Sequence, residues 1–599
     1  MRKFLFFFLI LGFAFDTLHA QNTGNENAWR EKVSPEIRAA FDRGEAVDLL
    51  AVFREKADLS GARFVRGKSA KARFVYDRLM ETASRTQANA IRLLRERQAK
   101  INSFSLVNAI VVDDAAPEIV RMLAALPEVA ALAPDPEVTL EMPRQGQLLP
   151  AERGAVEWGV QKINAPAVWA LGYSGQGITI GGADTGYEWE HPALKAHYRG
   201  WNEQSGVANH HYNWHDAIHE ISPLSGDSIP DPANNPCGVN APAPCDDHNH
   251  GTHTMGTMTG DDGLGNQIGV APGAQWVGCR NMERGNGKTS SYIECFEWFL
   301  APTDLDGKNP DVTKAPHVIN NSWYCSYEEG CTDLAVMELM RIAVSNLKAS
   351  GVVVVVSNGN SGSFGCGSTS GPPAFFEESF SVGATESNDT ITGFSSRGPV
   401  LIDGSMRTKP NVVAPGAGVR SAVRNGGYQH FWGTSMAGPH VAGLVALLLS
   451  ARPDLAGEVD IIENLIEETA VPKFDEKDCS DNGGQNYPNN TYGYGRINAL
   501  AAIQEALDFS PVSTNEPAMP GVKVYPNPVA DEAIFDVQYV SGKTTLDIFS
   551  ADGKCIFNET WTAVDRQLVP VQLQNLPEGV YFWKLTSGAV TQAGKLIKQ

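Results

Sequence analysis

The long middle part of the chain alternates short apolar runs with helical patterns. Near-continuous apolar runs at 178–184, 317–323 and 352–360 predict buried strands. Residues 334–350 have the spacing of an amphipathic helix that stops at Gly351, and residues 437–450 predict a buried helix. This alternation indicates a parallel sheet covered on both faces. We therefore expect an α/β fold over residues 155–508, with functional side chains at the carboxyl ends of strands.

Smaller units are predicted before and after this region. Residues 21–145 carry expected strands at 47–53, 105–112 and 129–134 and a helix at 116–126, which indicates a small α/β unit. A basic helical stretch runs from Arg63 to Lys100, and a polar link covers 141–154. Residues 522–599 alternate apolar and polar positions around a turn at 551–553, which predicts a small all-β sandwich. The stretch 509–521, rich in Pro, Ser and Thr, is the expected linker.

The first 20 residues have the pattern of a secretory signal peptide. Arg2 and Lys3 precede an apolar run of residues 4–15, and Ala20 is the expected cleavage point. The alternative is a membrane anchor, for which the run is short. Export to an oxidising compartment favours disulfides among the eight cysteines at 237–479. The close pairs 237/245 and 325/331 stand out, the connectivity stays open, and Cys555 is left over.

The net charge of −21 is unevenly distributed along the chain. Residues 22–140 hold 18 Lys and Arg against 17 Asp and Glu, whereas residues 141–599 hold 28 against 51. An acidic surplus of this size argues for solubility and against a nucleic-acid partner. The basic stretch in the front unit could steer that unit onto the acidic body.

Three short motifs supply the residue types of nucleophilic catalysis. Asp184 ends a predicted strand, His250 opens a segment of small residues, and Ser435 stands just before the buried helix. A serine hydroxyl needs a base, and the base needs a carboxylate that fixes its tautomer. The chain order Asp–His–Ser is one of those known for this geometry. Asn360, which follows Gly359 after a strand, is a candidate donor to an oxyanion together with the Ser435 N–H.

These motifs belong to a longer series that closely resembles the subtilisin-like serine proteases. Within that family, the block CRNMERG…SYIECFEWFLAPT (279–303) and the paired-cysteine segment after NNSW resemble the bacillopeptidase F-like group. The resemblance rests on motifs that run in family order: DTG (184–186), HGTH (250–253), GVAPGA (269–274), NNSW (320–323), SNGNSG (357–362), KPNVVAPG (409–416) and GTSMAGPHVAG (433–443). It implies a subtilisin-like parallel sheet with helices on both faces. It also implies a secreted serine endopeptidase with the triad Asp184, His250 and Ser435 and the oxyanion side chain Asn360.

The resemblance implies further site residues and no catalytic cofactor. Ser322, Trp323 and Gly359 fall on segments that bind substrate and border the pocket for the residue before the cut. No metal ligand is assigned, because the usual acidic calcium ligand soon after DTG is not obvious here, and structural calcium stays open. HTMGT replaces the commoner HVAGT after the histidine, with residues that are still mostly small.

The two flanking units resemble known partners of such proteases. Residues 104–138 match the β–α–β end of an inhibitory propeptide, which implies a zymogen that cuts itself between about 139 and 155. The alternative is a permanently attached domain. The motifs YPNP (525–528) and LPEGVYFWKL (576–585) match the sorting domain of type IX secretion cargo. This implies contact with that machinery, export across an outer membrane, and release or surface attachment. The alternative is a β-sandwich binding module, and we expect a monomer.

Two other functions compete with this interpretation. One is a surface adhesin on a decayed protease scaffold, which the complete set of triad residue types disfavours. The other is a metallohydrolase built on His248, His250 and His253, a spacing that can bind zinc. That site would leave Asp184, Asn360 and Ser435 without a role. We therefore expect His250 to be a base, His253 to be structural and His248 to be a loop residue.

Overall fold

The structure is a computed structural model. It describes residues 28–140, 143–151, 155–226, 234–324, 333–475, 479, 487–509, 521–525, 529–551, 553–574, 576–587 and 590–598. The predicted signal peptide, most of the linker, and Cys325 and Cys331 lie outside these residues.

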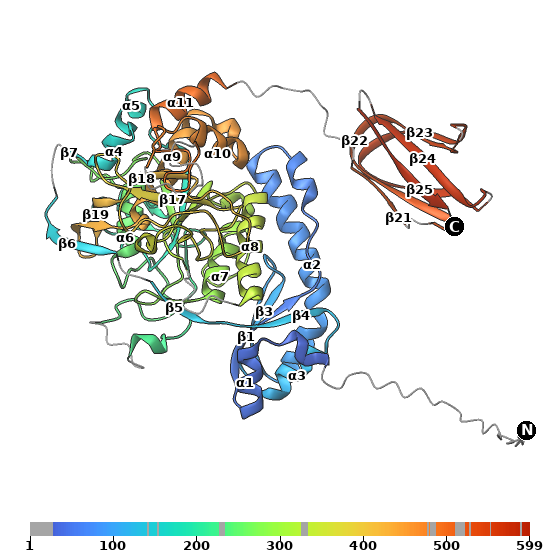
Figure 1. Ribbon diagram of the computed structural model, residues 1–599, viewed down its shortest axis with the longest axis horizontal. Coiled ribbons are helices and arrows are strands. Elements are labelled where there is room, and N and C mark those ends of the chain that lie inside the picture. Colours follow the sequence, from blue (N-terminus) through green and yellow to red (C-terminus); the bar gives the residue numbers. More distant parts are fainter. Residues whose placement is uncertain are drawn as a thin grey trace, which may run out of the picture.

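A seven-stranded sheet forms the centre of the large region (Figure 1). All of its neighbouring strands are parallel, as the buried apolar runs predicted. In spatial order the strands are β11 (Trp214–Asp216), β13 (Gln275–Arg280), β8 (Thr179–Asp184), β15 (Val318–Asn321), β16 (Val353–Ser357), β17 (Phe380–Thr385) and β18 (Val412–Pro415). The α/β fold class is confirmed.

Helices cover both faces of this sheet. One apolar cluster joins the sheet to α9 (Thr434–Ala451), and another joins it to α7 (Thr289–Leu300) and α8 (Leu334–Ala349). The helix α9 is the one described helix long and apolar enough to cross a membrane, and 89% of its apolar window is buried in protein. It is therefore the core helix that the sequence predicted. Shorter helices are α4 (Trp158–Lys162), α5 (Ala165–Ala170), α6 (His250–Thr259), α10 (Val459–Glu468) and α11 (Ala499–Asp508).

The front unit is a four-stranded antiparallel sheet with two main helices. The strand order is β2-β3-β1-β4, with β1 (Val47–Phe53), β2 (Lys100–Phe104), β3 (Ala109–Ala115) and β4 (Val129–Pro134). The helices are α2 (Lys68–Glu96) and α3 (Pro117–Ala125), with a shorter α1 (Pro35–Arg43). The predicted strand over 105–112 is wrong in its first half. Residues 105–108 form a turn, in which Asn108 has φ 51°, and the strand begins at Ala109.

The turn at 105–108 docks onto the large region through a half-buried carboxylate. Glu297 on α7 accepts hydrogen bonds from the N–H of Ser105 at 3.1 Å and from the N–H of Leu106 at 3.1 Å. Asn346 on α8 donates to the Leu106 carbonyl at 2.6 Å. The unit therefore lies along α7 and α8, where Figure 1 shows it in blue, and it shares an apolar cluster with them. Lys71 on the basic helix pairs with Glu458 at 3.6 Å.

The tail is all-β, as predicted. Its strands are β21 (Gly521–Tyr525), β22 (Glu532–Phe549), β23 (Cys555–Gln572), β24 (Gly579–Ser587) and β25 (Val590–Lys598). They join in one antiparallel sheet, because β22 is long enough to pair with β21 along its first half and with β24 along its second half. Leu546, Ile548 and Trp583 contribute to a separate apolar core.

Candidate active site

Asp184 and His250 form a buried pair at the carboxyl end of β8. Asp184 is the last residue of β8, and His250 is the first residue of α6. His250 Nδ1 lies 2.7 Å from Asp184 Oδ1, and the side chains are 0% and 1% exposed. An ionised carboxylate in this place fixes the histidine tautomer that carries its proton on Nδ1. His250 Nε2 has no hydrogen-bond partner among the described residues, so it is available as an acceptor.

Asp246 ties the Asp184 loop to the start of α6. Its Oδ1 accepts from Thr185 Oγ1 at 3.0 Å and from the His248 N–H at 2.9 Å. Its Oδ2 accepts from the Thr252 N–H at 3.1 Å, one of the unpaired donors of the helix start. Burial raises the pKa of this carboxyl. Our sequence reasoning assigned Asp246 no role, although a carboxylate just ahead of a helix start is a signal for such a contact.

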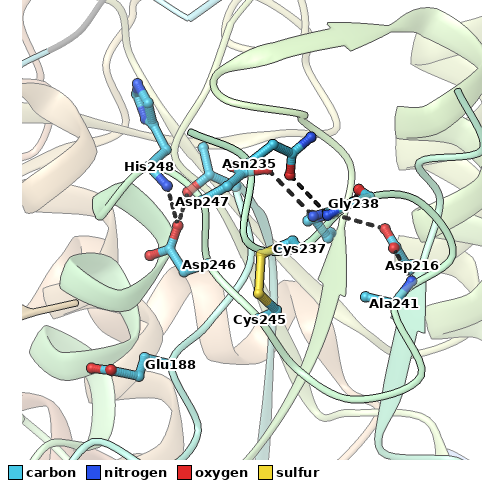
Figure 2. The surroundings of a disulfide bond; sticks show 12 residues. Glu188, Asp216, Asn235, Cys237, Gly238, Ala241, Cys245, Asp246, Asp247 and His248 are labelled. Atoms are coloured by element: carbon cyan, nitrogen blue, oxygen red, sulfur yellow. Dashed lines mark hydrogen bonds and ion pairs between the residues drawn. A yellow bond between two sulfur atoms is a disulfide. The ribbon is translucent and has the colours of Figure 1, made fainter. Parts of the chain in front are cut away.

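A disulfide closes the loop that leads into Asp246. Figure 2 shows the bond between Cys237 and Cys245, with Asp246–His248 on one side of it and the stretch around Gly238 on the other. The Cys245 carbonyl accepts from the Tyr187 N–H at 3.1 Å, next to the DTG motif. The pair 237/245 is therefore bonded, and the loop before His250 is fixed at both ends. Two further disulfides, 279–295 and 366–479, join other described cysteines, whereas the pair 325/331 lies outside the described residues.

The other two histidines near the start of α6 lie in different surroundings from the candidate base. His253 Nε2 lies 3.1 Å from the carbonyls of Val419 and of Gln429, and its ring stacks on Phe431 with centroids 4.2 Å apart. Burial lowers its pKa to about 3. His248 precedes the helix, and burial lowers its pKa to about 4. The prediction that His253 is structural and His248 is a loop residue is in accord with these contacts.

Ser435 lies in the first turn of α9. Our sequence analysis put it just before the helix, whereas it is the second helical residue, after Gly433 as the cap and Thr434. Ser435 Oγ donates to the Ser322 carbonyl at 3.0 Å, and Ser322 Oγ donates to the Ser435 carbonyl at 2.9 Å. The Ser435 hydroxyl therefore has to turn away from Ser322 to reach a base. Catalytic hydrogen bonds often form only in the reacting complex.

Asn360 lies beside the start of α9 with a defined orientation. Its Oδ1 accepts from Thr434 N and from Thr434 Oγ1, both at 2.9 Å. Because both contacts use the carbonyl oxygen, the Nδ2 group is left as the donor on the other side of the amide. Gly359 before it has φ 99°, a left-handed conformation that suits glycine. The strand β16 thus ends in a turn that presents an amide donor near Ser435.

Trp323 belongs to the apolar cluster that the large region shares with the front unit. Its ring stacks on Tyr292 of α7, with centroids 4.0 Å apart, and it is 1% exposed with the front unit docked. Val138 and Leu140 belong to the same apolar cluster as Trp323. The strand β5 (Glu137–Thr139) pairs antiparallel with β14 (Asn286–Lys288), and the Leu140 N–H donates to the Gly285 carbonyl at 2.7 Å. Our sequence analysis assigned no role to the 285–288 edge.

Pro143 and the strand after it lie along another edge of the large region, close to the start of α9. Pro143 lies beside Gly433, where a methyl group on the glycine would be 3.4 Å from Pro143 Cβ. The strand β6 (Arg144–Leu149) pairs antiparallel with β20 (Gly427–Trp432), which forms a hairpin with β19 (Ala417–Val423). Figure 1 shows β6 beside this hairpin. Pro143 thus lies beside the residue that stands two positions before the candidate nucleophile.

Within the described part of the chain, no group of three or more His, Cys, Asp or Glu side chains is arranged to hold a metal ion. No ligand is therefore assigned to calcium.

Comparisons with known proteins agree with this architecture. A model of the subtilase family matches residues 175–495, which is 321 of the 599 residues. A model of the secretion system C-terminal sorting domain matches residues 523–599. This tail indicates export by the type IX route to the cell surface or the extracellular space.

Several relatives share a large part of the sequence. Bacillopeptidase F of Bacillus subtilis (strain 168) is 34% identical over 510 residues, which is 80% of this chain and 33% of that protein. The chain thus spans about a third of the length of that relative. Subtilisin DY of Bacillus licheniformis is 31% identical over 350 residues, or 58% of this chain and 99% of that protein. Subtilisin E of Bacillus subtilis (strain 168) is 30% identical over 353 residues, or 58% and 72%. The chain therefore belongs to the subtilase family of serine peptidases.

Proposed function

We propose that this protein is a secreted serine endopeptidase that uses Asp184, His250 and Ser435 and is made as a self-processing zymogen. The observation that carries the proposal is the buried Asp184–His250 pair, 2.7 Å apart, with the outer nitrogen of His250 unpartnered. In such a pair the histidine is oriented so that its outer nitrogen can accept a proton from another group. Ser435, in the first turn of a buried helix, would supply the hydroxyl that a serine peptidase of this family uses as its nucleophile.

The reaction follows from these positions. The Ser435 hydroxyl turns from the Ser322 carbonyl and attacks the scissile carbonyl carbon while His250 Nε2 takes its proton. Asp184 holds the imidazole and stabilises the positive charge that forms. His250 returns the proton to the leaving amine, and a water molecule, activated in the same way, hydrolyses the acyl-enzyme.

The oxyanion would be held by two donors. The Ser435 N–H belongs to the first turn of α9, where backbone donors are unpaired within the helix. The Asn360 Nδ2 group is set by the two contacts that its oxygen makes with Thr434. Ser322, Trp323 and Gly359 would border the pocket for the residue before the cut, because they follow neighbouring strands β15 and β16 at the same edge of the sheet.

Residues 21–145 would be the inhibitory propeptide. The support comes from the two described residues before and after 141–142: the Leu140 N–H donates to the Gly285 carbonyl, and Pro143 lies beside Gly433, two residues before Ser435. The first self-cleavage would fall between residues 140 and 143, within the window of about 139 to 155 that the sequence defines, so the propeptide would end a few residues before 145.

The Ser435→Ala chain tests the proposal. We expect it to stay at full length and to hydrolyse no peptide, while its unfolding midpoint stays close to that of the parent chain. A Ser435→Ala chain that keeps full peptidase activity would refute the triad. A serine-directed phosphonate should stop the parent enzyme and should not stop a metallohydrolase, which a chelator should stop instead.

A further inference from the structure

The six-residue strand β6 pairs with the edge of β20, although most of its side chains are exposed. β6 pairs along β20 from Arg144 opposite Trp432 to Leu149 opposite Tyr428. Arg144, Gln145, Gln147 and Leu148 are exposed, so backbone hydrogen bonds and a few anchors hold the strand in place. An extended segment added to a free sheet edge is a known mode of peptide recognition. The strand directly follows Pro143, which lies beside Gly433, two residues before Ser435, so we assign the strand to the leaving-group side of the proposed cut.

Two of the anchors select side-chain chemistry near the reacting centre. The Arg144 guanidinium carbon lies 4.9 Å from the centre of the Trp432 ring, within the range of a cation–π contact. Gly146 lies against His430, where an added Cβ would be 3.3 Å from His430 Cβ and 3.4 Å from its carbonyl oxygen. A cation therefore fits at the first position, and at the second position any side chain beyond glycine would press on His430.

Two further anchors hold the far half of the strand. Gln429 Nε2 donates to the Gly146 carbonyl at 2.6 Å, which any residue type at that position would satisfy. Leu149 packs on a small apolar cluster formed by Ala193, Ile268, Ala422 and Tyr428. The surface thus offers, in order, an aromatic face, a tight position, a side-chain donor to the backbone and an apolar contact.

We propose that the β20 edge is a recognition surface for the leaving-group side of protein substrates, and that it selects the pattern Arg-x-Gly-x-x-Leu found at residues 144–149. The inference rests on the proposed function, because it assigns substrate preference to that same site. Residues 144–149 are the first occupant of the surface. After the cut in front of them they stay close to it, since β7 (Ala155–Val156) is paired with β12 (Asn266–Gln267) a few residues later.

Internally quenched peptides test the surface on the processed enzyme. The long peptide copies residues 137–149, and the short one copies 137–144, so both contain the same scissile bond. The enzyme is used as the parent chain and as Gly146→Val, a change that should displace its own strand from the edge. If the Gly146→Val chain does not cut itself, the double variant Arg144→Ala, Leu149→Ala is used to displace the strand instead.

In the displaced enzyme we expect kcat/KM for the long peptide to exceed that for the short peptide at least tenfold. Replacing Arg by Ala in the long peptide should lower kcat/KM about two- to fivefold, as an exposed cation–π contact predicts. A Trp432→Leu enzyme should no longer distinguish these two peptides. Replacing Gly by Val in the peptide should remove most of the gain.

Two results would overturn the proposal in distinguishable ways. Equal kcat/KM for the long and short peptides in both displaced variants would refute the surface while leaving the peptidase intact. Hydrolysis of neither peptide would count against the peptidase itself, and the surface would fall with it.

Discussion

Asp184 and His250 contact one another through a single short hydrogen bond, 2.7 Å between Oδ1 and Nδ1, in a setting that excludes water. We predict that Asp184→Asn lowers kcat about 10³- to 10⁴-fold, because the amide can present a donor to Nδ1 and hold the wrong tautomer. The KM for a peptide substrate should change much less. Steady-state kinetics on the processed enzyme measures both values.

Thr254→Val is the matched control for this change. Thr254 Oγ1 donates to the other oxygen of the same carboxylate, at 3.3 Å. Its removal leaves the contact with His250 in place, so we expect kcat to stay within about tenfold of the parent value. Comparable losses in the two variants would show that Asp184 acts through the packing of this region and not through the histidine.

Asp246 should matter for stability as well as for activity. Asp246→Ala leaves the buried donors of Thr185 and Thr252 without an acceptor, so we expect the free energy of unfolding to fall by at least about 3 kcal/mol. Asp246→Asn keeps one acceptor oxygen and should lose roughly half as much. Urea unfolding in the Ser435→Ala background avoids self-digestion. A loss below about 1 kcal/mol for Asp246→Ala would contradict the role of this carboxylate.

The Cys237–Cys245 disulfide should stabilise the loop before His250. Replacing both cysteines by serine removes the constraint on a loop with a sequence separation of 8, which is expected to cost about 2 to 3 kcal/mol. We expect thermal inactivation at a lower temperature and a smaller effect on kcat at 25 °C. An unchanged inactivation temperature would mean that the loop is held by Asp246 and its hydrogen bonds alone.

Release of the front unit should depend on pH through Asp135. This carboxylate accepts from the Ser290 N–H at the start of α7 at 2.9 Å, and burial raises its pKa to about 6. In the released unit the group returns to water and to an ordinary pKa of about 3.9. Docking therefore takes up a proton. The contribution of Asp135 favours the docked state most below about pH 4, and this advantage is lost as the pH rises through about 6.

We therefore expect the cleaved front unit to dissociate faster near pH 7 than near pH 4.5, as measured by the appearance of activity after processing. Asp135→Asn keeps an acceptor for Ser290 and removes the titration, so the dependence over this range should become weaker. An identical pH dependence in the two proteins would assign the effect to other groups at the interface.

The central fold could be predicted because its signals are local. Buried parallel strands read as continuous apolar runs, and α9 is apolar on all sides, so periodicity and composition identify both. The prediction of a strand over 105–112 was wrong because a residue far away in the sequence determines the conformation of its first half. Glu297 on α7 captures the N–H groups of Ser105 and Leu106, which a strand would use in its ladder.

The candidate site was predicted by motif order and not by geometry. Motifs name Asp184, His250, Asn360 and Ser435 because each side chain is chemically required. They do not show that Ser435 Oγ donates a hydrogen bond to the Ser322 carbonyl, because that contact joins residues 113 positions apart in the sequence. The hydrogen bonds of Asp246 were not predicted. The pairing edges of β14 and β20 were not predicted either, because backbone pairing does not require particular residue types.

Labelling with a fluorophosphonate, followed by mass spectrometry of the adduct and of the intact protein, tests the central claim most directly. We predict one adduct, on Ser435, in a species that has lost the front unit by a cut between residues 140 and 143, and no adduct in the Asp184→Asn chain on the same time scale. An already processed chain that takes no label, or takes it on another residue, would contradict the assignment of Ser435 as the nucleophile.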